Sequence, residues 1–249
     1  MNQPTAAMIV IGDEILSGRT RDSNANHLAC VMTEIGVRLT EVRMVADDPE
    51  AIKGAVNALR AANTYVFTSG GIGPTHDDIT ADCIAVAFGV PIDVRADARA
   101  ILVKHYEGTG RELNEARLRM ARIPDGAELI ENPISGAPGF RLGNVHVMAG
   151  VPAIFEAMVA TVRPTLQGGP KVLSHSLRCE IGEGDLAGPL GVAAEAFPDV
   201  SMGSYPFGGG AGAILVLRTA DRARLAEAVE MLRASLVPLG GVQSETLPE

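Results

Sequence analysis

The sequence predicts an α/β protein: a three-layer α/β/α domain around a mostly parallel sheet, then a small α+β domain of ferredoxin-like type. Short apolar runs alternate with helical segments along the first two thirds of the chain. That order is typical of a parallel sheet whose crossover helices cover both faces. A Gln-Gly-Gly-Pro step at 167–170 precedes a second series of strands and helices, so we expect a linker there.

The first domain, residues 1–168, is predicted from apolar runs and from the residues that start and end helices. Residues 6–11 form the short apolar run of a buried strand. Asp48-Pro49-Glu50 combines a capping carboxylate, a first-turn proline and an acid near the positive helix end, so we expect a helix to begin there. Gly36 and Gly89 are predicted helix ends. The predicted strands are 6–11, 37–45, 64–69, 127–130 and 144–148, and the predicted helices are 22–35, 49–62, 79–88, 97–107, 114–122 and 152–166.

The second domain, residues 169–249, is predicted to follow the order β-α-β-β-α. Its expected strands are 172–180, 200–205 and 213–219, and its expected helices are 185–196 and 221–236. This order resembles a small ferredoxin-like α+β sandwich.

The charge balance excludes one class of partner. Lys and Arg number 21 against 30 Asp and Glu, which gives a net charge of −9. A protein that grips nucleic acid through its phosphates usually has a basic excess, so no nucleic-acid partner is expected. A small phosphate ligand stays compatible with this charge, because backbone N–H groups and metal ions supply a positive field locally.

The chain has the features of a cytoplasmic protein. Its start reaches the charged residues Asp13 and Glu14 quickly, so no signal peptide is predicted. No apolar run approaches the ~20 residues that span a bilayer, so no membrane partner is expected. The cysteines Cys30, Cys83 and Cys179 are far apart in the sequence. We therefore expect no disulfide framework, and buried thiols at Cys30 and Cys83, as in a reducing compartment.

A glycine-rich segment, Ser69–Thr80, follows a predicted strand and precedes a predicted helix. Its glycines allow positive φ angles and let the backbone approach a ligand without a Cβ in the way. Consecutive N–H groups in such a turn form a cradle for an anion, to which the helix adds its positive end. No Lys follows the glycines, so this is not a Walker loop. The expected phosphate-binding residues of the turn are Ser69, Gly70, Gly71, Gly73 and Thr75, the serine and threonine through their hydroxyl groups.

Acidic residues in and around this turn predict a divalent cation. Carboxylates repel phosphate unless a cation lies between them, so Asp77 and Asp78 indicate Mg²⁺ or another divalent ion. Gly12-Asp13-Glu14 ends the first strand and Asp47-Asp48 ends the second. Because the carboxyl ends of parallel strands share one edge of a sheet, we expect these loops to converge on the glycine turn. The other interpretation is a tight strand-to-helix turn whose aspartates only cap a helix, and His76 is expected at the surface.

At these residues the chain resembles the molybdenum-cofactor-biosynthesis, or molybdopterin-binding, domain family, which includes MoaB- and Mog-like proteins. The matching pieces are 12–18, 45–48 and 69–74 with 78–80. Within the family the chain is most similar to the N-terminal portion of the competence/damage-inducible protein CinA, through 132–133 with 136–140, 149–152 and 203–206. It departs from the family at Ile72, where threonine is common, and at Met148-Ala149, where Leu-Pro is common.

The resemblance implies a three-layer α/β fold that binds molybdopterin or a nucleotide together with Mg²⁺. By motif position, Asp47 and Asp78 are the implied metal-binding and catalytic acids, and Glu14 is expected to assist them or to position a nucleophile. Arg119 and Asn114, on one short predicted helix, are expected to reach an outer phosphate, and a solvated helix face is the other interpretation. The residues expected to contact the rest of the ligand are Gly12, Asp13, Ser135, Gly136, Ala137 and Pro138.

Three functions stay open at this point. The CinA branch implies metal-dependent cleavage of a nucleotide diphosphate such as ADP-ribose, and a related eukaryotic domain is linked to FAD hydrolysis. The adenylyltransferase branch implies molybdenum cofactor biosynthesis, in which a pterin phosphate attacks ATP. A non-catalytic module that binds a nucleotide or a pterin is the third. The resemblance also implies a homo-oligomer, a dimer or a trimer.

Overall fold

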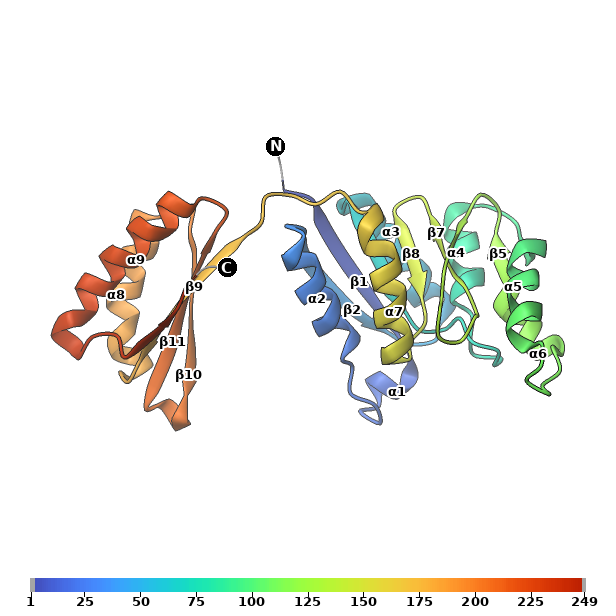
Figure 1. Ribbon diagram of the computed structural model, residues 1–249, viewed down its shortest axis with the longest axis horizontal. Coiled ribbons are helices and arrows are strands. Elements are labelled where there is room, and N and C mark those ends of the chain that lie inside the picture. The colour runs from blue at the N-terminus through green and yellow to red at the C-terminus, as the bar shows by residue number, and fades with distance from the viewer. Residues whose placement is uncertain (1–2, 248–249) are drawn as a thin grey trace. The chain divides into compact units, whose positions relative to one another are not determined.

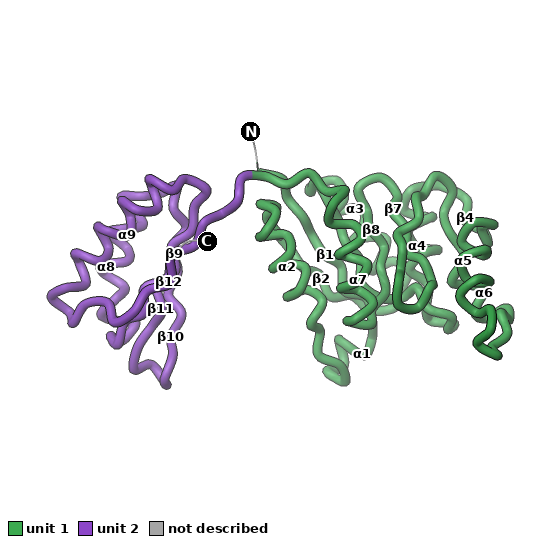
Figure 2. Tube along the Cα trace, viewed as in Figure 1, with its two compact units in different colours: residues 1–169 green, residues 170–249 purple. Residues whose placement is uncertain are grey.

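The computed structural model describes residues 3–247 and shows two compact units (Figure 2). The first unit ends at Gly169 and the second begins at Pro170. Two apolar clusters lie on either side of the sheet in the first unit, and one cluster fills the second. Each unit therefore has the buried core that a separate domain needs.

The first unit is built on a six-stranded sheet of order β2-β1-β3-β8-β7-β6. The first four of these strands run parallel, whereas β7 and β6 add an antiparallel end. The predicted, mostly parallel sheet is confirmed, and its parallel strands share one carboxyl edge. The strands are β1 (Thr5–Ile11), β2 (Arg38–Val45), β3 (Tyr65–Ser69), β6 (Glu128–Ile130), β7 (Gly139–Leu142) and β8 (Val145–Met148).

Helices cover both faces of this sheet and complete the predicted three layers (Figure 1). Alternate residues of β1 face opposite ways, because Ala7 and Ile9 join one apolar cluster while Ala6 and Met8 join the other. The helices α3 and α4 pack on the first of these faces, and α2 and α7 on the second. The helices of this unit are α1 (Asp13–Leu16), α2 (Asn24–Glu34), α3 (Pro49–Ala62), α4 (Thr80–Phe88), α5 (Ala96–Tyr106), α6 (Glu115–Leu118) and α7 (Pro152–Val162).

Local sequence explains where α3 begins and where α4 ends. The Asp48 carboxylate accepts a hydrogen bond from the Ala51 N–H at 2.8 Å, and Pro49 occupies the first turn. Gly89 takes a left-handed conformation with φ 67° and closes α4. Both predicted boundaries are confirmed.

Several short elements lie outside the prediction. They are α1, β4 (Ile92–Val94), β5 (Arg122–Pro124), β7 and β12 (Ser244–Thr246). The predicted helix 114–122 is wrong in its last part, because α6 ends at Leu118, a 3₁₀ turn follows to Ala121, and Arg122 pairs with Val94 between β5 and β4. Segments of three or four residues are too short to show a periodicity, so only their pairing partners define them.

The second unit is a four-stranded antiparallel sheet with two helices, in the chain order β-α-β-β-α-β. Its sheet order, β10-β11-β9-β12, is that of a ferredoxin-like domain. Leu177 and Leu215 on the strands and Leu232 on α9 meet in its core. Its other elements are β9 (Leu173–Cys179), α8 (Glu183–Ala196), β10 (Ser201–Phe207), β11 (Gly212–Thr219) and α9 (Arg222–Leu236).

The cysteines only partly match their predicted environments. Cys83 is buried, but Cys30 is exposed, so its predicted burial is wrong. Cys30 lies on the outer side of the amphipathic helix α2, whereas Leu28 and Met32 on the same helix face the core. In the described part of the chain, no helix combines the length and the apolar character needed to cross a membrane.

His146 on β8 is a polar side chain inside the core of the first unit. The residue is 3% exposed, and its ring stacks on that of Phe67 with 4.9 Å between the centroids. Its Nδ1 atom is buried and has no hydrogen-bond partner among residues 3–247. Burial lowers the pKa of His146 from its ordinary 6.5 to about 4, because the charged ring would lose its hydration.

The lowered pKa of His146 predicts a loss of stability in mild acid. As the pH falls from 6.5 towards 4, the unfolded chain binds a proton at His146 that the folded protein excludes. The free energy of unfolding should therefore fall, by up to about 3 kcal/mol from this group. Urea unfolding at pH 7 and pH 5 should show a smaller decrease for His146→Gln than for the wild type.

The control for this prediction is His76→Gln, because the His76 side chain is 98% exposed. That variant should keep the wild-type decrease between the two pH values. Equal decreases in the wild type and in His146→Gln would contradict the prediction, whatever the absolute stability of the variant.

Candidate functional site

A cavity of about 510 Å³ opens where the loops after β1, β2, β3 and β8 meet. Its volume suits a small-molecule ligand. The lining comes from Glu14 after β1, Asp47 after β2, residues 70–74 and 77–78 after β3 and Gly150 after β8. The acidic loops therefore converge on the glycine turn at the carboxyl edge of the sheet.

Gly70 and Gly71 form a turn that other residues cannot adopt without strain. Their φ angles are 109° and 68°, in the region that favours glycine. A Cβ on Gly70 would lie 2.2 Å from the Ile11 carbonyl oxygen, and one on Gly71 would lie 2.1 Å from Thr80 Oγ1. The Thr80 hydroxyl donates to the Gly70 carbonyl oxygen at 3.0 Å. The turn is therefore packed tightly against the end of β1 and the start of α4.

The backbone amides of this turn differ in their availability to a ligand. The Gly70 N–H donates to the Met148 carbonyl oxygen at 3.1 Å, so the expectation that this amide binds phosphate needs correction. Within residues 3–247, no protein acceptor takes the N–H groups of Gly71, Ile72 or Gly73. Free backbone donors are strong hydrogen-bonding groups. The amides of the turn that stay available to a ligand are therefore those of 71–73.

Ser69 and Thr75, which were expected to donate to phosphate, are used by the protein itself. Ser69 is buried, and its hydroxyl oxygen accepts from Asn24 Nδ2 at 2.7 Å. Thr75 donates its N–H and its hydroxyl to Asp78 Oδ2, at 2.8 and 2.5 Å. Neither Ser69 nor Thr75 lines the cavity. Asn24 also donates to the Gly150 carbonyl oxygen at 2.8 Å, so it joins the loops after β3 and β8.

Asp78 closes the glycine turn and does not cap α4. The residue at the N-cap of α4 is Ile79, and no side chain makes a capping hydrogen bond there. The interpretation in which the aspartates only cap a helix is therefore wrong. Asp78 holds Thr75 through one oxygen and lines the cavity together with Asp77.

The cavity is strongly acidic. Its lining includes the carboxylates of Glu14, Asp47, Asp77 and Asp78, and no Lys or Arg of the described chain contributes to it. Asp47 Oδ2 accepts the Asp13 N–H at 3.0 Å. Partial burial raises the pKa of Asp47, and the negative charges of Asp13, Glu14 and Asp77 add to the increase. A phosphate group would be repelled here unless a cation screened it.

A divalent cation at this cavity would have few protein ligands and would keep part of its water shell. Among residues 3–247, no group of three or more His, Cys, Asp or Glu side chains is placed to hold a metal ion by itself. Mg²⁺ is usually bound through one or two carboxylates, with waters and ligand phosphates completing its shell. Asp47 and Asp78 are the acids that would hold such an ion together with a ligand.

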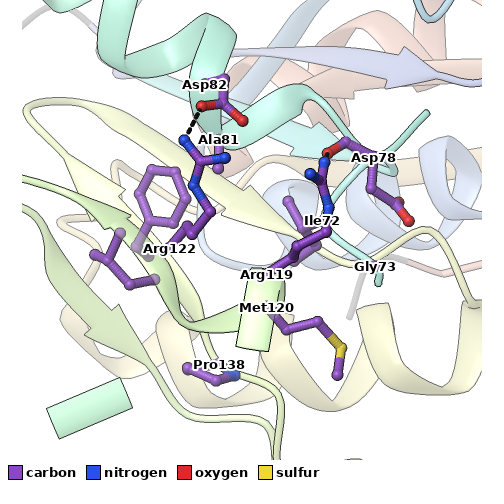
Figure 3. Close-up of a pocket in the computed structure, with 12 residues that line it drawn as sticks. Ile72, Gly73, Asp78, Ala81, Asp82, Arg119, Met120, Arg122 and Pro138 are labelled. Carbon is purple, nitrogen blue, oxygen red and sulfur yellow. Dashed lines mark hydrogen bonds and ion pairs between the residues drawn. The ribbon is translucent and has the colours of Figure 1, made fainter. Parts of the chain in front are cut away.

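Arg119 and Arg122 line a smaller cavity beside the glycine turn (Figure 3). Arg119 Nη2 donates to the Asp78 carbonyl oxygen at 3.2 Å, while its Nε is buried and has no partner in the described chain. Arg122 pairs with Asp82 at 2.5 Å. Arg119 thus lies beside the glycine turn, but it faces this smaller cavity and not the acidic one.

Comparison with known proteins identifies the family. Residues 7–168 match the family described as a probable molybdopterin binding domain, and residues 171–244 match the middle domain of FAD synthase. The chain belongs to the molybdopterin-binding domain family. The resemblance carried by the glycine turn and by the acidic loops is therefore confirmed.

Relatives place the chain among the CinA-like members of this family. A protein from Aeropyrum pernix is 34% identical over 97% of this chain and 97% of its own length. A CinA-like protein from Citrifermentans bemidjiense is 36% identical, and a probable FAD synthase from Caenorhabditis elegans is 33% identical, each over 81% of this chain. The chain spans only 48% and 44% of those two relatives. The crystal structure of CinA from Thermoplasma acidophilum is 34% identical and covers 66% of this chain and 99% of its own, with a TM-score of 0.61.

In this molybdopterin-binding domain, the remaining predicted ligand residues divide between the two cavities and their surroundings. Those that line the acidic cavity are Gly12, Ser135 and Ala137, and the one that lines the smaller cavity is Pro138. Those that line neither cavity are Asp13, Gly136 and Asn114. Asn114 accepts the Arg117 N–H through Oδ1 at 3.0 Å and caps α6.

Asn132 and Thr20 line the acidic cavity of the molybdopterin-binding domain without having been predicted. Asn132 is buried and donates to Ser135 Oγ at 2.6 Å and to the Ala137 carbonyl oxygen at 2.8 Å, so it shapes one wall. An Asn before a proline and a glycine-containing turn is a usable signal for this role. Thr20 stands in a loop whose sequence carries no such signal.

Proposed function

We propose that this chain cleaves the diphosphate linkage of a nucleotide diphosphate such as ADP-ribose or FAD, with a divalent cation at Asp47 and Asp78. One observation carries the proposal: an acid-lined cavity adjoins three free backbone amides at the carboxyl edge of a parallel sheet. Carboxylates without a cation would repel phosphate, and backbone amides that bind phosphate directly would not need carboxylates beside them. Together they suit a metal-bound phosphate. The match to the middle domain of FAD synthase and the relative described as a probable FAD synthase support a nucleotide ligand.

The proposed reaction adds water across the linkage. The oxygen of water bonds to one phosphorus, the bridging P–O bond breaks, and the second phosphate leaves with the bridging oxygen. The cation, when bound, neutralises charge on the phosphate oxygens. The amides of 71–73 donate to the same phosphate, and Glu14 orients the attacking water and takes its proton. Ser135 and Ala137 also line the cavity, and the base or flavin would lie against them.

Purified protein incubated with ADP-ribose or FAD tests this function. With Mg²⁺, Mn²⁺ or Co²⁺ supplied, AMP should accumulate, and a chelator should stop its release. If no cation yields AMP from either compound, the hydrolase proposal fails.

A second function, molybdenum cofactor biosynthesis, is favoured by the family match over 7–168. In that case the acidic cavity would take a pterin phosphate, which would attack ATP. Deletion of the gene should then lower the activity of molybdoenzymes in the host. If deletion leaves molybdoenzyme activity unchanged, a function in molybdenum cofactor biosynthesis is rejected. A third reading, a module that binds ligand without turnover, predicts tight nucleotide or pterin binding and no product with any cation.

The proposal also includes a cytoplasmic location and a homo-oligomer of two or three copies. The three free cysteines support a reducing compartment. The resemblance to the family supports the assembly. Sedimentation of the purified chain tests the oligomer, and a monomer at all concentrations would contradict it.

A further inference from the structure

Two cavities near the glycine turn differ in the charge of the residues that line them. The acidic cavity has no basic residue among its described lining, whereas a second cavity of about 410 Å³ on the outer side of α4 is lined by Lys53, Arg119 and Arg122. Asp82 is the one carboxylate of that second lining. We call this second cavity the basic cavity. In a chain of net charge −9, three permanent cations around one hollow form a local positive field.

The smaller cavity in Figure 3 has a volume of about 20 Å³ and shares lining residues with both the acidic and the basic cavity. It shares Gly73 and Asp78 with the acidic cavity, and it shares Arg119 and Arg122 with the basic cavity. Figure 3 shows the Arg119 and Arg122 side chains rising from one short segment on the same side of the glycine turn. The glycine turn and the two arginines therefore surround one small space, so a ligand bound at the amides of 71–73 would lie close to the cations of the basic cavity.

The cations of the basic cavity keep unused hydrogen-bonding capacity. A guanidinium has five N–H donors. Arg119 uses one on the Asp78 carbonyl oxygen, and its buried Nε has no partner in the described chain. Arg122 makes one bond, to Asp82, and Lys53 pairs with Glu50, whose side chain is 83% exposed. An anion with several oxygens would satisfy these donors, because guanidinium groups bind phosphate with charge-assisted bonds.

We propose that the ligand carries two linked phosphates, of which one stays with the amides of 71–73 and the other is bound in the basic cavity by Arg119, Arg122 and Lys53. This inference rests on the proposed function, whose substrates carry two linked phosphates, and it assigns a binding site to the second of them. The group beyond the second phosphate lies over Pro49, Ile79 and Val86, which line the apolar part of the basic cavity. A ligand with a single terminal phosphate would occupy only one of these two sites, the amides of 71–73 or the basic cavity.

Calorimetric titration with ADP-ribose and with AMP, each in the presence of Mg²⁺, tests the basic cavity. The ADP-ribose used as the probe carries a methylene group in place of the bridging oxygen, so that it is not cleaved during the titration. The wild type should prefer ADP-ribose. Arg122→Gln and Lys53→Gln should each reduce affinity for ADP-ribose about 10-fold and leave affinity for AMP nearly unchanged, because each removes a charge-assisted contact to the second phosphate. The matched control is Arg141→Gln, since Arg141 forms a similar exposed pair with Glu128 at 2.7 Å and lines neither the acidic nor the basic cavity. It should bind both ligands as the wild type does.

Asp82→Asn separates anion binding from a structural role of the Arg122–Asp82 pair. If Arg122 binds phosphate, removal of the competing carboxylate should preserve or tighten ADP-ribose binding. A purely structural pair would make Asp82→Asn behave like Arg122→Gln, and that result would overturn the proposal, as would equal losses for ADP-ribose and AMP in Arg122→Gln.

The same titrations, together with AMP release from unmodified ADP-ribose, distinguish this proposal from the proposed function. Preference for ADP-ribose that depends on Arg122, without AMP release, would reject the hydrolase function and keep the basic cavity. If AMP is released but Arg122→Gln keeps the wild-type preference for ADP-ribose, the hydrolase function stands and the basic cavity is rejected as the second phosphate site.

Discussion

Asp47→Asn should lower the rate of nucleotide cleavage at least about 100-fold, because it removes a charge proposed to hold the cation where the phosphates react. Asparagine has the shape of aspartate, and its Oδ1 can still accept the Asp13 N–H that Asp47 binds at 3.0 Å. The fold should therefore survive. Because burial and neighbouring acids already raise the pKa of Asp47, loss of this charge should leave the unfolding midpoint unchanged or slightly higher.

The measurement combines AMP release at several Mg²⁺ concentrations with thermal unfolding of the same samples. Asp125→Asn is a suitable control, since Asp125 is exposed and lies outside the acidic cavity. It should retain wild-type activity. A fully active Asp47→Asn protein would remove Asp47 from the metal site and would weaken the hydrolase proposal with it.

Gly70→Ala should both destabilise the first unit and abolish binding at the glycine turn. The added Cβ would lie 2.2 Å from the Ile11 carbonyl oxygen, and φ at this position is 109°. A backbone oxygen at the end of β1 cannot move as a flexible side chain would. We expect a loss on the order of 3 kcal/mol in the free energy of unfolding, together with displacement of the 71–73 amides.

Urea unfolding and nucleotide titration of Gly70→Ala check both parts of this prediction. Gly89→Ala is the matched control, because Gly89 also has a positive φ, 67°, but a Cβ there meets nothing within 4 Å. It should cost only about 1 kcal/mol, the usual strain of a left-handed residue, and bind ligand normally. Similar losses in the two variants would show that the contact with Ile11 is not what makes Gly70 necessary.

The sequence predicted the framework of the site better than its hydrogen bonds. Apolar runs and helix caps located β1, β3 and α4, and hence the edge at which the acidic loops converge. It did not show which hydroxyl groups already make hydrogen bonds within the protein. The Ser69 hydroxyl oxygen accepts from Asn24, and the Thr75 hydroxyl donates to Asp78. A hydroxyl satisfied inside the protein and one free for a ligand look identical in a sequence.

The sequence also did not predict the short antiparallel strands. Strand β7 has four residues and pairs with β6 and β8, and β5 begins at Arg122, which local pattern had placed in a helix. Pairing across the sheet defined these elements, and a single segment carries no record of its partner. The same missing prediction hid Arg122 from the sequence analysis, because its position beside Arg119 depends on where the helix ends.

By itself, the sequence determined the layered α/β class, the second ferredoxin-like unit, the family, and the set of glycines and acids around the site, because these follow from periodicity, caps and local motifs. Only the tertiary structure decided which amides remain free, which hydroxyl groups are already bonded, and that no Lys or Arg of the described chain lines the acidic cavity. Those properties depend on contacts between residues far apart in the chain, such as Gly70 with Met148 and Arg122 with Asp82, and local sequence does not encode them.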